Sequence, residues 1–265
     1  MRRPRLTGEG PGRLTLRRHA RALVAVGAIA VTGPTPAHAQ APTPTPTPTP
    51  FTVAAPSRAN GSTVARLVAP AFARHDLRAA KSGRRLGTTT SWSAQPQALL
   101  VLEGATFEGQ DWVKVLLPTR PNGSTGWVPR DRVALGRSRY WITVRLRTRR
   151  VTVYRDGKRV RSFRAVIGAR ATPTPLGLAA IYERNRQPNP RVFVGPWVLS
   201  LTSLSNVLES YGGGPGRVAI HGRSGASLRD PLGSARSHGC MRVNNRDVRW
   251  LATRVPAGTP VHVRR

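Results

Sequence analysis

Residues 237–242 read SHGCMR and contain Cys240, the single cysteine of the chain. Upstream, a strand-like run at 217–220 ends in the pair His221-Gly222. The N-terminus of the chain indicates export, and an unpaired thiol in an oxidising compartment is a liability unless its chemistry is used. The sequence therefore predicts an enzyme with a cysteine nucleophile.

His221 is the predicted base for this cysteine. A thiol is a weak nucleophile until a nearby histidine takes its proton, and we expect Cys240 and His221 to form a thiolate–imidazolium pair. Gly222 permits close approach of the backbone, and its carbonyl is expected to orient the far nitrogen of the His221 ring. The pair does not need a carboxylate as a third catalytic group. Two aspartates lie near in sequence, but turn formation explains Asp230 and the start of a predicted helix explains Asp247.

The segment 237–240 predicts a tight turn around the nucleophile. Gly239 lets consecutive amides point at one spot, where they would stabilise the oxyanion formed when the thiolate attacks a carbonyl. Arg242 follows at a spacing from which its guanidinium would reach a substrate carboxylate. The predicted site thus combines a nucleophile, a base, oxyanion donors and a ligand for a carboxylate.

The N-terminal part of the chain carries an export pattern. Residues 1–39 predict a signal peptide, with an arginine-rich start, an apolar stretch at 22–31 and the sequence AHA before Gln40. The apolar stretch is too short for a permanent anchor, so we expect no stable membrane span. Residues 40–60 predict a Pro/Thr-rich linker in extended conformation. We therefore expect an exported protein of the cell wall or the periplasmic (extracytoplasmic) space.

The charge of the chain is strongly positive. It holds 43 basic and 11 acidic residues, a net charge of +32. Residues 1–40 hold seven arginines and one acid, which leaves 36 basic and 10 acidic residues for the exported part. Such a field attracts polyanions, including the anionic polymers of a cell wall. We expect no nucleic-acid partner, because the sequence contains neither a basic recognition helix nor a run of aromatic stacking residues.

Residues 61–136 predict a small antiparallel barrel. Short alternating segments are separated by glycine and Asn-Gly turns. The stretch 109–115, followed by 126–128, resembles the closing strands of bacterial SH3-like domains. Side chains alternate along a strand, so Trp112 cannot face the same side as Val113. The strands expected in this domain are 64–68, 97–102, 112–117 and 126–129.

Residues 140–265 predict a second, mainly β domain with one or two helices. Alternating β-branched residues around Asp156-Gly157 are typical of a hairpin. A helix is expected at 246–255, with Asn244 or Asn245 as its cap. The expected strands are 141–144, 150–154, 159–167, 178–182, 197–199, 218–221 and 260–263.

These motifs together resemble the catalytic domain of the L,D-transpeptidase (YkuD-type) family. The resemblance rests on His221-Gly222, Leu232-Gly233 and the SHGCMR stretch. The sequence TPTPLG at 172–177 is similar to the proline-rich segment of that family. The resemblance covers about residues 140–263, and it implies a β-rich enzyme that cross-links peptidoglycan without a cofactor or a metal.

The resemblance also implies roles for single residues. Cys240 would attack the third residue of a stem peptide, release the terminal D-alanine and form a thioester, with His221 as base. Ser237, His238, Gly239 and Arg242 would line the site, with the amides of Gly239 and Cys240 near the oxyanion and with Gly222 and His238 as orienting residues. The variable flap of the family would correspond to 182–216, where Tyr211 is expected to contact substrate, with packing in a core or at a hinge as the alternative. Peptidoglycan stem peptides would be the substrates, and carbapenems would be inhibitors.

Other functions remain open at this level. A zinc site would use His221, His238, Cys240 and His262, but a second cysteine is absent. The same thioester would serve an L,D-carboxypeptidase or a protein-anchoring enzyme, because the acceptor decides the outcome. A non-catalytic wall-binding protein is the alternative from a different class.

Overall fold

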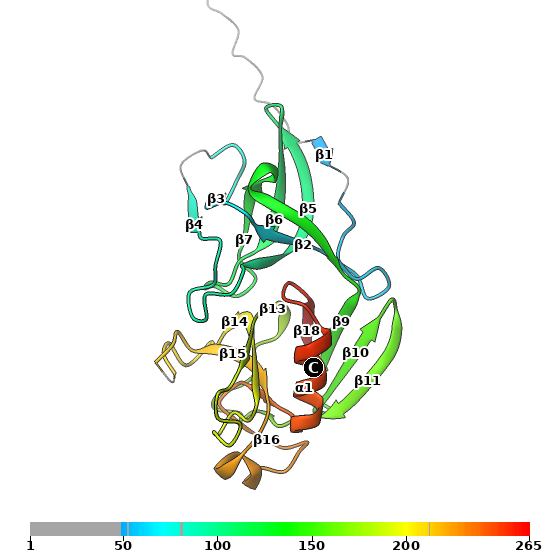
Figure 1. The fold of residues 1–265 in the computed structure, drawn as a ribbon, viewed down its shortest axis with the longest axis vertical. Helices are drawn as coiled ribbons and strands as arrows, with labels where there is room; N and C mark the ends of the chain where they lie inside the picture. The colour runs from blue at the N-terminus through cyan, green and yellow to red at the C-terminus, as the bar shows by residue number, and fades with distance from the viewer. Residues whose placement is uncertain (1–48, 52, 80–81, 212) are drawn as a thin grey trace, which may run out of the picture. The chain divides into compact units, whose positions relative to one another are not determined.

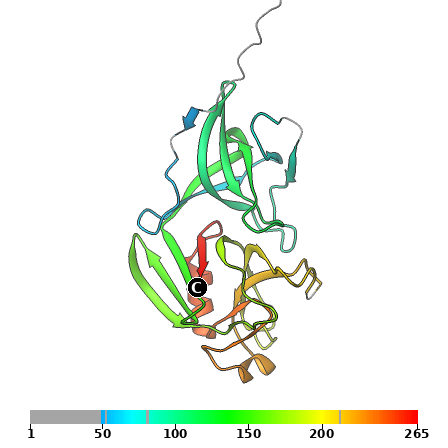
Figure 2. The ribbon, with the colours of Figure 1, turned by 180° about the vertical axis from the view of Figure 1, so that it is seen from behind.

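The computed structural model describes residues 49–51, 53–79, 82–211 and 213–265. The described residues belong to one compact unit. The predicted signal peptide at 1–39 and the first part of the predicted linker lie outside the described residues. The described part contains 18 strands and one α-helix, so the predicted fold class, mainly β, is confirmed (Figures 1 and 2).

The first sheet contains the described strands before residue 139. Its order is β4-β3-β7-β6-β5-β2-β8, with β1 paired to β5, and its pairings are antiparallel. The four strands predicted here correspond to β2, β5, β6 and β7, whereas β1, β3, β4 and β8 were not predicted. That this sheet is an SH3-like domain stays a prediction. The strands are β1 (Thr49–Phe51), β2 (Ser62–Leu67), β3 (Ala71–Arg74), β4 (Gly83–Leu86), β5 (Ala98–Phe107), β6 (Gln110–Leu116), β7 (Thr125–Pro129) and β8 (Val133–Ser138), with a short 3-10 helix at Arg130–Arg132.

Strand β6 is buried on both faces. Val113 and Val115 point into one apolar cluster with Leu99 and Val101. Trp112 points to the opposite side, into a second cluster that includes Phe107. The alternation expected for this strand is therefore confirmed, and each face has its own core.

The second sheet carries the candidate site. Its order is β11-β10-β9-β18-β13-β14-β15-β17, and a separate parallel pair joins β12 to β16. The strands are β9 (Tyr140–Arg145), β10 (Arg150–Arg155), β11 (Lys158–Arg164), β12 (Ile167–Gly168), β13 (Gly177–Arg186), β14 (Trp197–Leu204), β15 (Arg217–His221), β16 (Ala235–Ser237), β17 (Met241–Arg242) and β18 (Pro260–Arg264). A 3-10 helix spans Gly225–Arg229, and α1 spans Asn245–Arg254.

The predicted hairpin and helix are present, with two refinements. Asp156 and Gly157 form the turn between β10 and β11 with φ of 49° and 77°, as an Asp-Gly turn of this type requires. The strand expected at 159–167 is divided, because β11 ends at Arg164 and Ile167 pairs with Ala235 instead. Asn244 is the cap of α1, and its side chain accepts a hydrogen bond from the Arg246 amide.

Helix α1 packs its apolar stripe into the core of the second sheet. Val248, Leu251, Ala252 and Val255 recur at helical spacing and are buried in the main apolar cluster. The same cluster contains residues of β14, β15 and β17, so the helix supports the strands that end at the candidate site. Within the described residues, no helix combines the length and the apolar character that crossing a bilayer requires.

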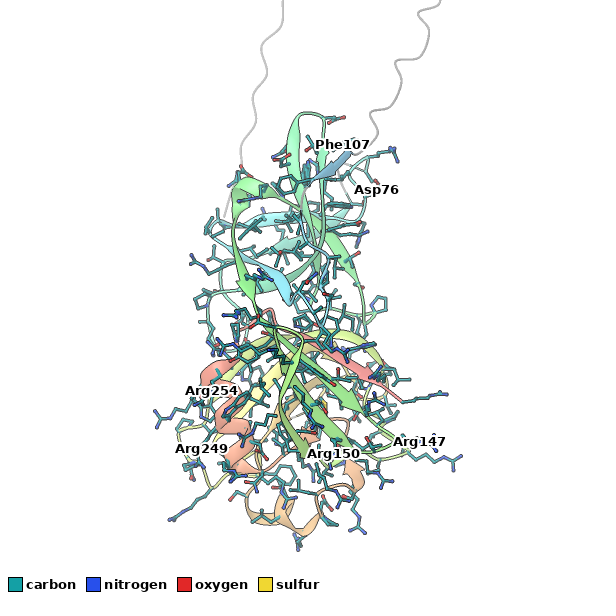
Figure 3. All side chains as sticks on the ribbon, turned by 90° about the vertical axis from the view of Figure 1, so that its right-hand side faces the viewer. Asp76, Phe107, Arg147, Arg150, Arg249 and Arg254 are labelled. Atoms are coloured by element: carbon teal, nitrogen blue, oxygen red, sulfur yellow. The ribbon has the colours of Figure 1, made fainter. Side chains whose placement is uncertain are left out.

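Arginine side chains project from several elements of the described chain. Arg249 and Arg254 lie on the exposed side of α1, and Arg147 and Arg150 lie at the β9–β10 connection (Figure 3). The positive charge is therefore spread over the surface of the second sheet and its helix.

The two sheets are joined by direct hydrogen bonds. The Asn122 side chain donates to the Leu204 carbonyl (2.7 Å) and accepts from the Leu204 amide (2.8 Å). The hydroxyls of Ser138 and Thr259 are 2.7 Å apart and buried. Residues of both sheets can consequently line one cavity.

Candidate active site

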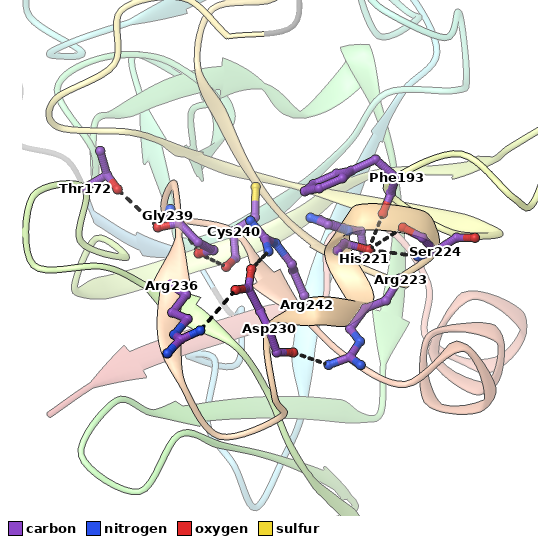
Figure 4. A network of polar contacts seen from close by, with 12 residues as sticks. Thr172, Phe193, His221, Arg223, Ser224, Asp230, Arg236, Gly239, Cys240 and Arg242 are labelled. Carbon is purple, nitrogen blue, oxygen red and sulfur yellow. Dashed lines mark hydrogen bonds and ion pairs between the residues drawn. The ribbon is translucent and has the colours of Figure 1, made fainter.

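Strand register brings the cysteine and the histidine to one face of the second sheet. Strands β15 and β17 are parallel, with Ile220 opposite Met241 and His221 opposite Arg242. Ile220 and Met241 point into the apolar core, so His221 and Arg242 point to the other face. Cys240 directly precedes β17 and, with His221 and Arg242, lines a cavity of about 360 Å³ (Figure 4). The structure thus places the predicted nucleophile and base in one cavity.

The orientation of His221 agrees with the expectation for a base. Its ring is 4% exposed, and its Nδ1 lies 2.7 Å from the Gly222 carbonyl oxygen. A carbonyl only accepts hydrogen bonds, so Nδ1 carries the proton and Nε2 is free of one. Gly222 must be a glycine, because a Cβ there would lie 2.4 Å from Asn245 Oδ1.

The electrostatics of the site favour a neutral resting pair. Burial lowers the pKa of His221 from 6.5 to about 4, and the Arg242 charge adds to this, against the opposing effect of the Gly222 carbonyl. Burial also raises the pKa of Cys240, although the Ala219 backbone and Arg242 act in the opposite direction. Both shifts favour a thiol and a neutral imidazole at rest over the expected ion pair.

The turn before Cys240 is fixed by hydrogen bonds of its own. The Ser237 hydroxyl donates to the Cys240 carbonyl (2.6 Å) and accepts from the Gly239 amide (3.1 Å). Gly239 has a φ of 113°, which favours glycine. The expectation that the Gly239 amide faces an oxyanion is therefore wrong, because this amide is used inside the turn.

The proline-rich segment at 172–177 is hydrogen-bonded to this turn. Thr172 donates through its hydroxyl to the Ser237 carbonyl (3.1 Å), and Thr174 donates to the Gly239 carbonyl (2.8 Å). The Thr174 hydroxyl also accepts from the Gly168 amide (2.9 Å). The two threonines of the TPTP sequence are positioning residues that were not predicted.

Arg242 has a different environment from the one expected. Its buried guanidinium forms an ion pair with Asp230 and lies over the Phe193 ring, 4.8 Å from the ring centroid. Arg236 lies 3.9 Å from the same carboxylate (Figure 4). The interpretation of Asp230 as a turn residue alone is therefore wrong, since it neutralises Arg242. Arg242 Nε is buried and has no hydrogen-bond partner among the described residues, so this donor remains available.

Two predicted site residues lie at the mouth of the cavity. Tyr211 is 52% exposed, and its ring lies 5.5 Å from that of the exposed His238. The alternative that Tyr211 packs in a core is thus wrong. The flap expected at 182–216 is partly regular structure, because β13 continues to Arg186 and β14 occupies Trp197–Leu204.

Several lining residues were not predicted. Ser91 and Trp92 come from the part of the chain before residue 139, which forms the first sheet, and Glu183 and Asn185 come from β13. No motif joins them to the SHGCMR stretch, so only the folded chain identifies them. Among the described residues, no group of three or more histidines, cysteines or acids is placed to hold a metal ion.

Comparisons with known proteins agree with this site. The family model of the L,D-transpeptidase catalytic domain (YkuD) matches residues 139–263. The protein named "Putative L,D-transpeptidase YkuD" of Bacillus licheniformis is 37% identical over 124 residues, which are 47% of this chain and 65% of the relative. The protein of the same name in Bacillus subtilis is 32% identical over 126 residues, or 48% of this chain and 66% of the relative.

The chain thus spans just under two thirds of the length of these curated relatives. Among solved structures, an L,D-transpeptidase from Mycobacterium smegmatis is 16% identical, with a TM-score of 0.38 over 58% of this chain and 90% of that one. The family match contains both Cys240 and His221. Residues 139–263 therefore match the L,D-transpeptidase catalytic domain of the YkuD family, the family that the sequence motifs resemble.

Proposed function

We propose that this protein cross-links peptidoglycan as a cysteine-dependent L,D-transpeptidase. One observation carries the proposal: Cys240 and His221 line the same cavity, and the Gly222 carbonyl fixes the His221 ring so that Nε2 is unprotonated. A neutral imidazole that shares a cavity with a thiol supplies the base that nucleophilic catalysis requires.

The acylation step follows from this arrangement. His221 Nε2 takes the thiol proton as Cys240 Sγ attacks the carbonyl of the third stem residue. The new S–C bond gives a tetrahedral oxyanion, for which the Cys240 amide and Arg242 Nε are the candidate donors. The peptide C–N bond then breaks, and the imidazolium gives its proton to the leaving nitrogen of D-alanine. A thioester on Cys240 remains.

The second step reverses the proton transfers. A side-chain amine of a neighbouring stem attacks the thioester and gives a proton to His221 Nε2. The C–S bond breaks, and the thiolate recovers the proton. Water in place of the amine would give an L,D-carboxypeptidase, and a protein amine would give an anchoring enzyme. Transpeptidation is the preferred assignment because residues 139–263 match the model of this family.

The proposed location is the cell wall or the extracytoplasmic space. The support is the export pattern of residues 1–39 and the excess of basic residues, which suits a matrix of anionic polymers. A reactive β-lactam carbonyl would occupy the place of the scissile amide, so carbapenems are the proposed inhibitors.

The proposed function predicts which products form when disaccharide tetrapeptide is the substrate. The protein is expected to release D-alanine and form cross-linked dimers, whereas the Cys240→Ala variant forms neither, as followed by mass spectrometry. D-alanine release without dimers would reassign the protein as a carboxypeptidase. An absence of turnover together with binding to intact wall would favour the non-catalytic wall-binding protein.

A further inference from the structure

A loop from the part of the chain before residue 139 is hydrogen-bonded to the second sheet, which carries the candidate site. This docking loop, residues 87–97, connects β4 to β5 and is closed by its own backbone bonds between Thr90 and Gln95 and between Thr88 and Gln97. It faces strand β13, and Ser93, Gln95 and Gln97 bond to that strand. The bonds are Ser93 N–Glu183 Oε1 (3.3 Å), Gln95 Nε2–Arg184 O (2.9 Å), Gln95 Nε2–Asn185 Oδ1 (2.7 Å), Gln95 Oε1–Arg184 N (3.2 Å) and Gln97 Oε1–Tyr182 Oη (3.3 Å).

The side chains at the contact between the docking loop and β13 are buried, which indicates that the loop is packed on this strand. Gln97, Tyr182 and Glu183 are all buried. Removing the loop would leave the Glu183 carboxylate without its bond from the Ser93 amide, which is costly for a buried charged group. The docking loop is thus held on β13 by buried polar contacts, and breaking these contacts would cost free energy.

Trp92 lies within this loop and remains open to solvent. Its side chain is 63% exposed and lines the same cavity as Cys240 and His221. A Cβ on Gly214 would lie 3.3 Å from the Trp92 ring, so the absence of a side chain there lets the indole lie against the segment between β14 and β15. The indole is therefore placed at the cavity by contacts on two sides.

The mouth of the cavity is aromatic. Phe193 and Tyr211 also line it, and both are exposed large rings like Trp92. Exposed aromatic surface gains free energy when a ligand covers it, and tryptophan and tyrosine dominate binding energies where they do so. None of these rings has a role in the proton transfers at Cys240.

We propose that Trp92 is a substrate-binding residue of the catalytic site, which packs against the disaccharide tetrapeptide donor. The inference rests on the proposed function for the identity of this donor. The ring makes contact with the part of the donor away from the scissile bond, so it contributes binding and not bond making. The active site is then composite, because the half of the chain before residue 139 supplies one wall.

Binding to an inactive background tests this directly. The dissociation constant of disaccharide tetrapeptide is measured by calorimetry for the full-length Cys240→Ala protein and for the same protein carrying Trp92→Ala. We expect Trp92→Ala to raise the dissociation constant about tenfold. Trp92→Phe is expected to recover most of the affinity. The matched control is Phe72→Ala, because Phe72 is 38% exposed on β3 and lines a different cavity. That control is expected to bind the donor as the background does.

A small acylating agent separates a binding role from a structural one. Trp92→Ala with Cys240 intact is expected to react with a carbapenem within about twofold of the parent rate, because the small ligand does not extend to the mouth. Equal donor affinity with and without Trp92, or an equal loss in carbapenem acylation, would overturn the inference. Failure of the proposed function is distinct, since it would show as donor binding without turnover by the parent.

Discussion

Replacement of His221 by glutamine is expected to slow acylation of Cys240 by a carbapenem by about 10²- to 10⁴-fold. In the proposed mechanism, Cys240 Sγ attacks the lactam carbonyl, the ring C–N bond opens, and His221 carries the thiol proton to the ring nitrogen. Because the pKa of Cys240 is raised, little thiolate forms without the imidazole. Intact-mass measurement of the carbapenem adduct over time gives the rate.

The matched control for this variant is His238→Gln. His238 also lines the cavity, but it is exposed, and its ring is tilted by 32° against the Tyr211 ring. We expect this control to acylate at nearly the parent rate. A full rate in His221→Gln, with a loss in His238→Gln, would transfer the role of base to His238.

Acid is expected to destabilise the fold through His221. The pKa of this histidine is about 4 in the folded protein, against an ordinary value of 6.5. Below pH 6.5 the unfolded chain gains a proton that the folded chain does not, so the free energy of unfolding decreases as the pH falls from about 6.5 to about 4. Between pH 7.5 and pH 5.0 the contribution of this residue is about 2 kcal/mol.

Urea unfolding at the two pH values measures this contribution. Other groups titrate in the same range, so the quantity of interest is the difference between the parent and His221→Gln. The variant is expected to lose about 2 kcal/mol less than the parent on acidification. Equal losses in both proteins would show that His221 is not held neutral by burial.

The features that local sequence determines were predictable. Alternation gave the β fold, the Asp156-Gly157 turn and the opposite faces of β6, because each depends on neighbours along the chain. The bond from His221 Nδ1 to the Gly222 carbonyl was also predictable, since both groups belong to adjacent residues. Helix α1 followed from its cap and its apolar spacing.

The features that tertiary contacts determine were not predictable. Asp230 and Arg242 are twelve positions apart, and only the fold shows that they neutralise one another. The Ser237 hydroxyl takes up the Gly239 amide, a detail of turn geometry that residue types do not reveal. Trp92 reaches the cavity through the docking of a loop that is more than a hundred residues from Cys240 along the chain. The resting protonation of the pair likewise depends on burial, which the sequence does not contain.

The central claim is that an acyl group is transferred through the sulfur of Cys240. The most direct test stops the protein during turnover of disaccharide tetrapeptide, digests it at acidic pH and measures the mass of the peptide that contains Cys240. The account predicts the mass of a disaccharide tripeptide added to Cys240 through a thioester that hydroxylamine removes, with no such addition in Cys240→Ala. Turnover to cross-linked product without that addition at any time point, or with the acyl group on another residue, would contradict it.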